Sequence, residues 1–333
     1  MKSIIYGIIS LLSATGMMNA APLGITGPAY FYPGPLWEQM NAAASQVPLT
    51  AIMNPASGPE AAAADITNYN NAVLSLQAAG GRVIGYIFTS YGVRDITAIK
   101  RDVDLYVTQF MTLNGFFLDE MKDYPTADEL TNYREIYRYI KAKSANYQVT
   151  ANSGIYSGEI YLQAPAATDT LVTFENKEGY DTAAAPAWVL NHLARRFMHI
   201  PWSVATAEQM ETYVRLAKSR NTGQIYITDD DGKIVGSNSL NPWDTLPSYW
   251  QQEVQLVKSL NATELATRLS LTRSQSGLID LQINGSPGVY EVQVTQDLVQ
   301  WNTLTTSFTA SGLLTLTDPA GGNFTKRFYR AVQ

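Results

Sequence analysis

The chain has 333 residues and a formal net charge of −6, and 46% of its residues are hydrophobic while 16% are charged. This composition excludes a disordered chain, and the length allows one large domain or a large and a small one. The acidic balance argues against a nucleic-acid partner, because phosphate binding needs clustered Lys and Arg. The chain has no cysteine and two histidines, which excludes disulfides, thiolate nucleophiles and cysteine-built metal sites and argues against a multi-histidine metal site.

The N-terminal segment has the pattern of a secretory signal. Lys2 supplies the positive start and Ile4–Leu12 the apolar core. Either Met18-Asn19-Ala20 or Asn19-Ala20-Ala21 supplies a small-residue cleavage site. An N-terminal helix retained in the fold is the alternative. No later segment reaches the ~18 consecutive apolar residues of a membrane span. We therefore predict a signal peptide over residues 1–21 and a secreted, periplasmic or cell-surface protein with no membrane contact after cleavage.

Eight segments of the next part of the chain have the composition of buried strands. An apolar run bounded by polar or turn residues is typical of a strand in a parallel sheet. The eight predicted strands are Ala29–Tyr32, Leu49–Asn54, Arg82–Thr89, Gly115–Glu120, Tyr147–Asn152, Thr170–Asn176, Arg196–Ser203 and Gly223–Asp229.

Segments with helical spacing of apolar residues lie between these strands. They are Ile66–Ala79, Asp95–Met111, Ala127–Lys143, Ala207–Ser219 and Tyr249–Leu260. Eight strand–helix units over this length predict an α/β fold, a (β/α)₈ barrel over residues 22–260. An open doubly wound sheet is the alternative. No Gly-x-Gly-x-x-Gly follows the first strand, so we expect no dinucleotide cofactor.

After Leu260 the pattern changes to short alternating strands separated by Gly, Asn, Pro and Asp. The predicted strands are Leu269–Leu271, Leu278–Ile283, Val289–Val294, Asn302–Ser307, Leu313–Thr317 and Arg327–Ala331. They predict a small all-β sandwich over residues 262–333, with the boundary between Ser259 and Thr267. Carbohydrate binding and simple structural spacing are both open as its role.

Two predicted strands end in carboxylates, which is the main functional signal. Gly115–Glu120 ends in Asp119 and Glu120, and Thr170–Asn176 contains Glu175 near its end. Catalytic residues of barrel enzymes lie at the carboxyl ends of strands, and glycosidases need a pair of carboxyl groups. Adjacent strand residues point to opposite sides, so we predict that Asp119 and not Glu120 faces the substrate. The alternative is that these acids are helix caps or solvated turn residues.

Polar and aromatic residues near other strand ends are candidates for substrate contacts. A low charge content with 20 Tyr and 6 Trp suits a neutral polymer such as a glycan, whose rings stack on aromatic faces. For each candidate, a structural role in a loop or in the core is the alternative, and a satisfied buried histidine is the default for His199. The candidates are Tyr32, Asn54, Ser57, Tyr86, Tyr91, Asn152, Asn176, His199, Trp202 and Asp229, with Tyr226 as a weaker one.

The segment Asp229-Asp230-Asp231-Gly232 follows the eighth predicted strand. Calcium prefers carboxylate oxygens, but the spacing of a calcium-binding EF-hand loop and its terminal Glu are absent. We predict an acidic turn and no metal, and we expect no cofactor.

The motifs together resemble the spherulin-4-like (spherulation-specific) family of glycoside hydrolases over residues 25–256. The matching segments are Tyr30–Trp37, Asn54–Pro59, Gly85-Tyr86 with Thr89–Gly92, Gly115–Glu120, Phe174–Asn176 and Leu246–Trp250. The chain departs from the family pattern at Ala151–Gly154, where Asn-Pro-Gly is expected after the fifth strand.

The resemblance implies a barrel with endo-α-1,4-N-acetylgalactosaminidase activity on galactosaminogalactan, a partly deacetylated exopolysaccharide. It places the catalytic candidates on Asp119, Glu120 and Glu175. Our hypothesis is an exported, monomeric, endo-acting glycoside hydrolase of an amino-sugar exopolysaccharide, of the kind found in biofilms. Asp119 would be the nucleophile, Glu175 the general acid/base and Glu120 a supporting group, with retention of configuration.

Other mechanisms and functions remain open at this stage. An N-acetyl group of the substrate could replace the enzyme nucleophile. The alternative function is a non-catalytic carbohydrate-binding barrel in cell-surface or matrix attachment. A polysaccharide deacetylase is disfavoured, because such enzymes commonly use a histidine-rich metal site.

Overall fold

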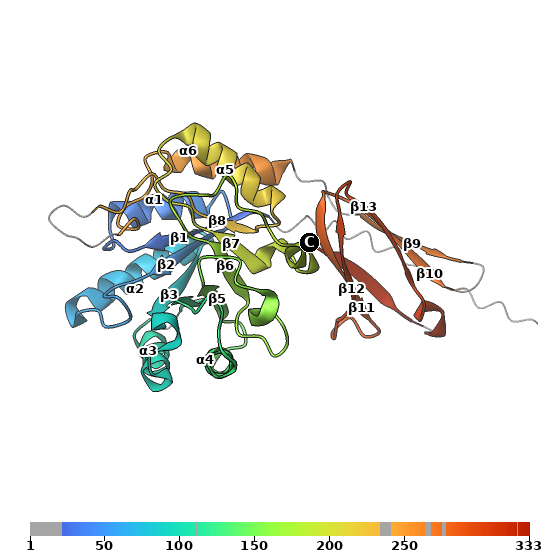
Figure 1. Ribbon diagram of the computed structural model, residues 1–333, viewed down its shortest axis with the longest axis horizontal. Helices are drawn as coiled ribbons and strands as arrows, with labels where there is room; N and C mark the ends of the chain where they lie inside the picture. The colour runs from blue at the N-terminus through green and yellow to red at the C-terminus, as the bar shows by residue number, and fades with distance from the viewer. Residues whose placement is uncertain (1–21, 111, 234–240, 264–267, 275–277, 325) are drawn as a thin grey trace, which may run out of the picture. The chain divides into compact units, whose positions relative to one another are not determined.

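The computed structural model describes residues 22–110, 112–233, 241–263, 268–274, 278–324 and 326–333 (Figure 1). These residues form two compact units, one ending at Thr263 and one comprising the described residues from Arg268 onward. The predicted signal peptide, residues 1–21, lies outside the described residues. No helix in the described ranges is long and apolar enough to cross a membrane.

The first unit is a closed barrel of eight parallel strands in chain order, each paired with its two neighbours. This confirms the predicted (β/α)₈ fold. The strands are β1 (Gly24–Ala29), β2 (Leu49–Met53), β3 (Arg82–Phe88), β4 (Gly115–Asp119), β5 (Gln148–Asn152), β6 (Thr170–Phe174), β7 (Phe197–His199) and β8 (Gln224–Ile225).

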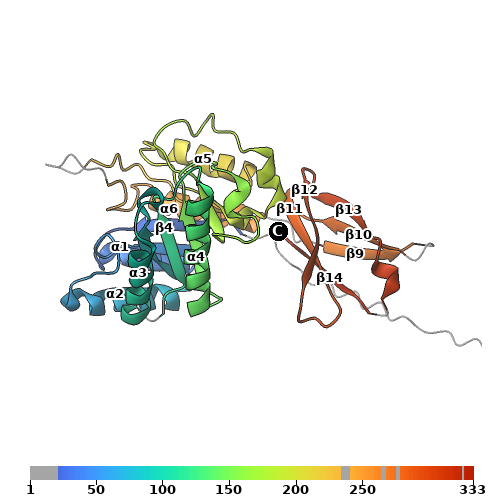
Figure 2. The ribbon, with the colours of Figure 1, turned by 60° about the horizontal axis from the view of Figure 1, so that its bottom comes forward.

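Helices surround the barrel, as Figure 1 shows. They are α1 (Pro35–Ala44), α2 (Ala63–Ala78), α3 (Ile96–Gln109), α4 (Ala127–Lys143), α5 (Ala207–Ser219) and α6 (Trp250–Ala262). Figure 2 shows α3 and α4 side by side next to β4. The connections from β5 to β6 and from β6 to β7 have short 3₁₀ turns in place of an α-helix: η2 (Glu159–Tyr161), η3 (Ala187–Asn191) and η4 (Ala194–Arg196).

Helices α4 and α5 have the predicted bounds because their ends carry local signals. The Thr126 hydroxyl and the Glu129 carboxylate form a reciprocal capping box at the start of α4. At the start of α5 the Thr206 hydroxyl accepts a hydrogen bond from the Gln209 N–H at 3.2 Å, which is a simple N-cap. Helix α1 was not predicted. It begins with Pro35 in its first turn, where proline is well tolerated.

The first strand is Gly24–Ala29, so the predicted strand Ala29–Tyr32 was wrong in position. Two glycines in β1, Gly24 and Gly27, weaken the strand pattern of this segment in the sequence. A Cβ atom at Gly27 would lie 2.7 Å from a ring carbon of Tyr226, and one at Gly24 would lie 2.6 Å from the Gln224 side chain. Glycine is required at position 27 because the Tyr226 ring packs directly on the strand backbone, whereas at position 24 the flexible end of Gln224 could shift.

Gly115, at the start of β4, is predicted to tolerate no larger residue. Its φ is 154°, and an added Cβ would lie 1.9 Å from the backbone oxygen of Gln148 on β5. We expect Gly115→Ala to lower the free energy of unfolding by about 2–4 kcal/mol. The reason is that either the backbone at Gly115 must change its conformation or β4 must move away from β5. Urea unfolding curves measure this. Gly34→Ala is the control, since a Cβ there meets only the Tyr32 oxygen at 4.0 Å. Equal stability of the two variants would contradict the prediction.

The second unit consists of two three-stranded antiparallel sheets. Their strand orders are β13-β10-β9 and β12-β11-β14. Side chains of both sheets form one core, made of Leu281 and Ile283 from one sheet and Tyr290, Val292 and Ala331 from the other. The strands are β9 (Arg268–Arg273), β10 (Ile279–Asn284), β11 (Gly288–Thr295), β12 (Asn302–Thr309), β13 (Leu313–Asp318) and β14 (Phe328–Val332).

Candidate active site

Two of the predicted acids lie together at the carboxyl ends of the barrel strands. Asp119 ends β4, Asn152 ends β5 and Glu175 follows β6. The Asn152 amide nitrogen donates hydrogen bonds to both carboxylates, at 2.7 Å to Asp119 Oδ1 and with Glu175 Oε2 as its second acceptor. One buried amide therefore holds the two carboxyl groups side by side.

A β-bulge in β6 directs Glu175 into the barrel. Thr170 lines the barrel interior, and strict alternation would place Glu175, five residues later, on the outside. The register with β7 shifts between Val172 and Phe174. Thr173 and Phe174 both face outward as a result, since both contact His199. The extra residue changes the phase of the strand, and Glu175 points inward.

The shared hydrogen-bond donor limits the distance between the two carboxyl groups. Two oxygens that accept from the same nitrogen are at most about two hydrogen-bond lengths apart, roughly 5–6 Å. For these two oxygens the limit is closer to the ~5–5.5 Å spacing of retaining glycosidases than to the ~6.5–9.5 Å of inverting ones.

The environment favours a proton on Glu175. Burial and the nearby charge of Asp119 raise the pKa of Glu175 to about 8, although the Asn152 hydrogen bond opposes the shift. Burial also raises the pKa of Asp119, against hydrogen bonds from the Glu120 N–H, Asn152 and Tyr86. Asp119 has three donors that favour its ionised form, so at neutral pH we assign the proton to Glu175 and the negative charge to Asp119.

Glu120 follows the last residue of β4, so strand alternation does not set the direction of its side chain, and its role relative to Asp119 stays a prediction. Its φ of 51° ends β4 in a left-handed conformation. The Glu120 carbonyl accepts hydrogen bonds from the Thr89 hydroxyl and the Tyr91 N–H, at 2.7 and 2.6 Å. Burial and then the charge of Asp119 raise the pKa of Glu120, while a hydrogen bond from the Ser90 N–H lowers it. Its backbone thus fixes the loop after β3, and its carboxyl group lies near Asp119.

Three tyrosines surround the acid pair. Tyr86 lies inside the barrel, stacked on Phe117 at 6.4 Å, and donates a hydrogen bond to Asp119. Tyr91 is 58% exposed, and the charges of Glu120, Asp119 and Glu175 contribute to its raised pKa after burial. Tyr30, which was not predicted as a site residue, packs edge-on against Tyr86 at 5.4 Å. Its signal in the sequence was its place directly after a strand, but the first strand was predicted out of position.

Asn152 is a positioning residue, and its removal has a predicted electrostatic effect. We expect Asn152→Ala to raise the pKa of Glu175 further, by roughly one unit, because a hydrogen bond to a charged group is worth about 1.5–3 kcal/mol. Carboxyl ¹³C NMR titration measures the shift. Asn176→Ala is the matched control, since Asn176 is exposed and its amide oxygen accepts a hydrogen bond from the Glu178 N–H and from no other described residue. An unchanged titration of Glu175 in Asn152→Ala would exclude this role.

Tyr32, Asn54 and Ser57 lie in the loops after β1 and β2. Tyr32 is 51% exposed and is anchored to α2, where its hydroxyl donates to Asp65 Oδ1 at 2.8 Å. The Asn54 side chain accepts a hydrogen bond from the Gly58 N–H at 2.8 Å, so this oxygen closes its own loop. Ser57 is exposed with a φ of 53°.

Asn176, Trp202 and Asp229 follow β6, β7 and β8. The backbone N–H of Trp202 donates to the Asn176 carbonyl at 3.3 Å. The Lys177 ammonium lies 5.9 Å from the centre of the Trp202 ring. Asp229 accepts from the N–H of Ser248 at 3.0 Å and from its hydroxyl. These residues remain predictions as substrate contacts.

His199 and Tyr226 are corrected as candidate substrate contacts because both are fully buried. Burial and the charge of Arg220 lower the pKa of His199 to about 3, so this histidine is neutral. Its Nε2 lies 3.0 Å from the Thr173 hydroxyl, so it supports the bulge that directs Glu175. Tyr226 packs between Trp243 and Trp250.

The acidic segment after β8 is an ordered turn. The Gly232 N–H donates to Asp230 Oδ1 at 2.8 Å and the Lys233 N–H to Asp231 Oδ1 at 3.1 Å. Asp231 also pairs with the Lys233 ammonium. Within the described ranges, no three His, Cys, Asp or Glu side chains are grouped so that they could hold a metal ion.

Comparison with known proteins identifies a family. The family model described as "Spherulin4: Spherulation-specific family 4" matches residues 24–257. Spherulin-4 of Physarum polycephalum is 31% identical over 252 residues, which cover 73% of this chain and 72% of that protein. The family resemblance seen in the sequence motifs is thereby confirmed.

Solved structures also align with the chain at low identity. An endo-β-1,4-mannanase from Thermotoga petrophila is 9% identical, with a TM-score of 0.47, over 95% of this chain and 97% of that one. A maltogenic α-amylase, AmyB, from Thermotoga neapolitana is 8% identical, with a TM-score of 0.45, over 90% of this chain and 99% of that one.

Proposed function

We propose, from the premise that the chain belongs to spherulation-specific family 4, that it hydrolyses glycosidic bonds with Asp119 and Glu175 as its catalytic pair. The observation that carries this proposal is the shared hydrogen bond of both carboxylates to the Asn152 amide. Paired acids at strand ends, one protonated and one charged, are what glycoside hydrolysis requires.

The two acids take different roles in the proposed reaction. Glu175, protonated because its pKa is raised to about 8, gives its proton to the departing glycosidic oxygen. Asp119 attacks the anomeric carbon from the opposite face and forms a glycosyl ester. Water then attacks that ester while Glu175 accepts a proton from the water, and the configuration is retained.

Tyr86 and Asn152 prepare Asp119 for attack. Their hydrogen bonds hold the carboxylate in place and favour its ionised form. Tyr91 presents an exposed ring next to the acids, where a sugar ring can stack. Glu120 contributes negative charge near the anomeric centre, where positive charge develops in the transition state.

The proposed substrate is an amino-sugar exopolysaccharide, cut within the chain, and the proposed location is outside the cell or at its surface. The resemblance of the motifs to galactosaminogalactan-degrading enzymes supports the polymer, and the pattern of residues 1–21 supports export. The loop Ala151–Gly154, which departs from the family pattern, lies beside the acid pair.

The test is product analysis after incubation with purified exopolysaccharides, galactosaminogalactan among them. We expect oligosaccharides that shorten with time, and ¹H NMR of the first products should show the anomeric configuration of the substrate. Binding without any products over the whole panel would instead support a non-catalytic carbohydrate-binding barrel. If an oxazoline compound inhibits the protein and the Asp119→Ala variant stays active, the N-acetyl group of the substrate is supported as the nucleophile.

A further inference from the structure

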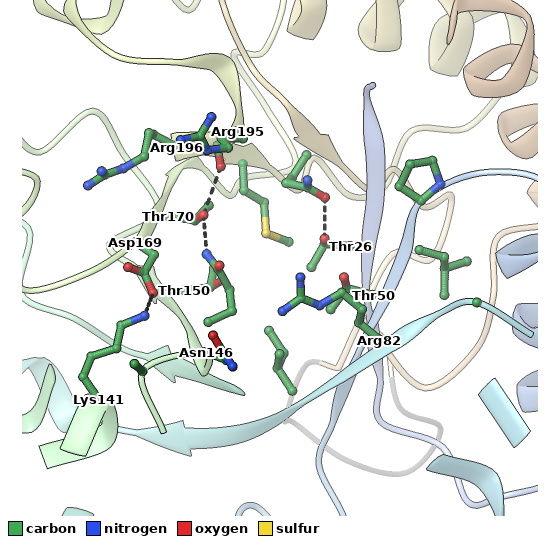
Figure 3. A pocket seen from close by; sticks show the side chains of 18 residues that line it. Thr26, Thr50, Arg82, Lys141, Asn146, Thr150, Asp169, Thr170, Arg195 and Arg196 are labelled. Atoms are coloured by element: carbon green, nitrogen blue, oxygen red, sulfur yellow. Dashed lines mark hydrogen bonds and ion pairs between the residues drawn. The ribbon is translucent and has the colours of Figure 1, made fainter. Parts of the chain in front are cut away.

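The barrel is hollow at the end opposite to the acid pair. A cavity of about 490 Å³ lies among the first residues of β1–β3 and β5–β8, as Figure 3 shows. Its size is in the range of small-molecule pockets, ~300–1,000 Å³, and far exceeds the space that a single water needs. Asp119 and Glu175 lie at the other ends of their strands, so this cavity is separate from the proposed active site.

The wall of the cavity is polar where a barrel is normally apolar. Bulky Val, Ile and Leu fill the interior of most barrels of this fold. Threonine has nearly the shape of valine, so packing alone does not call for its hydroxyl group. Four barrel strands nevertheless contribute a threonine to the wall: Thr26, Thr50, Thr150 and Thr170.

Hydrogen bonds hold this wall in a fixed arrangement. The Thr26 hydroxyl donates to Gln224 Oε1 at 2.7 Å, and the Thr170 hydroxyl donates to the Arg195 carbonyl at 3.0 Å. The Gln148 amide nitrogen donates to the Thr170 oxygen at 2.9 Å. In the described part of the chain, the Gln224 amide nitrogen makes no hydrogen bond. It is therefore available as a donor to a bound molecule.

Cationic side chains surround the cavity. Its lining contains four cationic side chains and one carboxylate, in a chain whose net charge is −6. The carboxylate, Asp169, is already paired with Lys141 at 2.6 Å. Arg82 and Arg195 are exposed, and Arg82 reaches from the start of β3 toward the centre of Figure 3. The electrostatic environment therefore favours an anion.

We infer that this cavity binds a small anionic molecule with several hydroxyl groups, of the size of a monosaccharide. Arg82 binds its carboxylate or phosphate, Arg195 adds positive charge at the rim, and the threonines and glutamines bind its hydroxyl groups within. Sugar acids and sugar phosphates share this chemistry.

The test is isothermal titration calorimetry of the full chain with galacturonate, galactose 6-phosphate, galactose and inorganic phosphate. We expect at least one of the two anionic sugars to bind, and to bind at least about tenfold more tightly than galactose or phosphate. Arg82→Gln should weaken that binding about tenfold or more, since a charge-assisted hydrogen bond is worth about 1.5–3 kcal/mol. Arg195→Gln, which removes positive charge at the rim, should weaken it by a smaller factor. Thr150→Val, which keeps the volume of the wall, should weaken it without changing the unfolding temperature.

The control is Arg138→Gln, which removes the same charge from an exposed position of α4 outside the cavity. It should bind as the unchanged protein does. Absence of binding by both anionic sugars would overturn the inference. So would phosphate binding as tightly as the sugars, or binding that Arg82→Gln, Arg195→Gln and Arg138→Gln leave equal.

Discussion

Glu175→Gln is expected to lower kcat by ~10²–10⁴-fold, the range for loss of a general acid, and Asp119→Asn by about 10⁴-fold or more. The variants should remain folded, because each replaces a carboxyl group with an amide of the same shape. Glu175→Gln should be at least as stable as the unchanged chain at pH 8, where a buried Glu175 with a pKa of about 8 would otherwise ionise. Reducing-end assays and thermal unfolding measure both effects.

The two variants should also differ from each other with an activated substrate. An aryl glycoside with an acidic phenol needs no proton to depart, so Glu175→Gln should recover much of its first step, whereas Asp119→Asn should not. Glu178→Gln is the control, since Glu178 is exposed and three residues away. Full activity of either acid variant on the polymer would disprove the assignment of that residue.

Glu253→Gln is expected to raise stability at neutral and alkaline pH. Glu253 on α6 is fully buried, and its Oε1 accepts a hydrogen bond from the Ile227 N–H at 3.1 Å. In the described residues its Oε2 has no hydrogen-bond partner. Burial raises the pKa of Glu253 from 4.5 to about 8. A raised carboxyl pKa stabilises the fold fully below pH 4.5 and loses that contribution as the pH rises toward 8.

The expected size of this loss is roughly 3–5 kcal/mol between pH 4.5 and 8. Glutamine keeps the carbonyl that accepts from Ile227 and cannot ionise, so Glu253→Gln should remove that part of the pH dependence. Denaturant unfolding at pH 5 and pH 8 gives the difference, and Glu38→Gln, at an exposed position of α1, is the control. Parallel pH dependence in Glu253→Gln and the unchanged chain would show that Glu253 is not the responsible group. Glu175, which titrates in the same range, is common to both proteins.

Local signals explain which elements were predictable. The cap residues of α4 and α5 act on their own turns, so those bounds follow from a few neighbouring residues. Strand β1 was misplaced because its glycines serve contacts with Tyr226 and Gln224, about 200 residues away in the chain. Such contacts exist only after the barrel closes. The aromatic run Tyr30–Tyr32 has the higher strand propensity but lies in the loop after β1.

The acids of the candidate site could be predicted from the sequence, whereas the roles of its supporting groups could not. Asp119 and Glu175 follow apolar runs, and the order of strands in a barrel brings strand ends to one face. Asn152 and Tyr86 stood in the sequence only as possible substrate contacts, and their hydrogen bonds to Asp119 follow from the folded barrel. Tyr30 was missed because the first strand was predicted out of position. Glu175 also escapes a simple alternation rule, since the bulge at Thr173-Phe174 reverses its side of the strand.

That bulge makes the number of residues in β6 as important to the proposed chemistry as their identity. Loss of one residue between Val172 and Phe174 would restore plain alternation and turn Glu175 away from Asp119, with every site residue still present in the sequence. A relative without the extra residue would need its acid one position earlier. In an alignment of such proteins, a single gap at this strand would therefore mark a functional change that identity at Glu175 conceals.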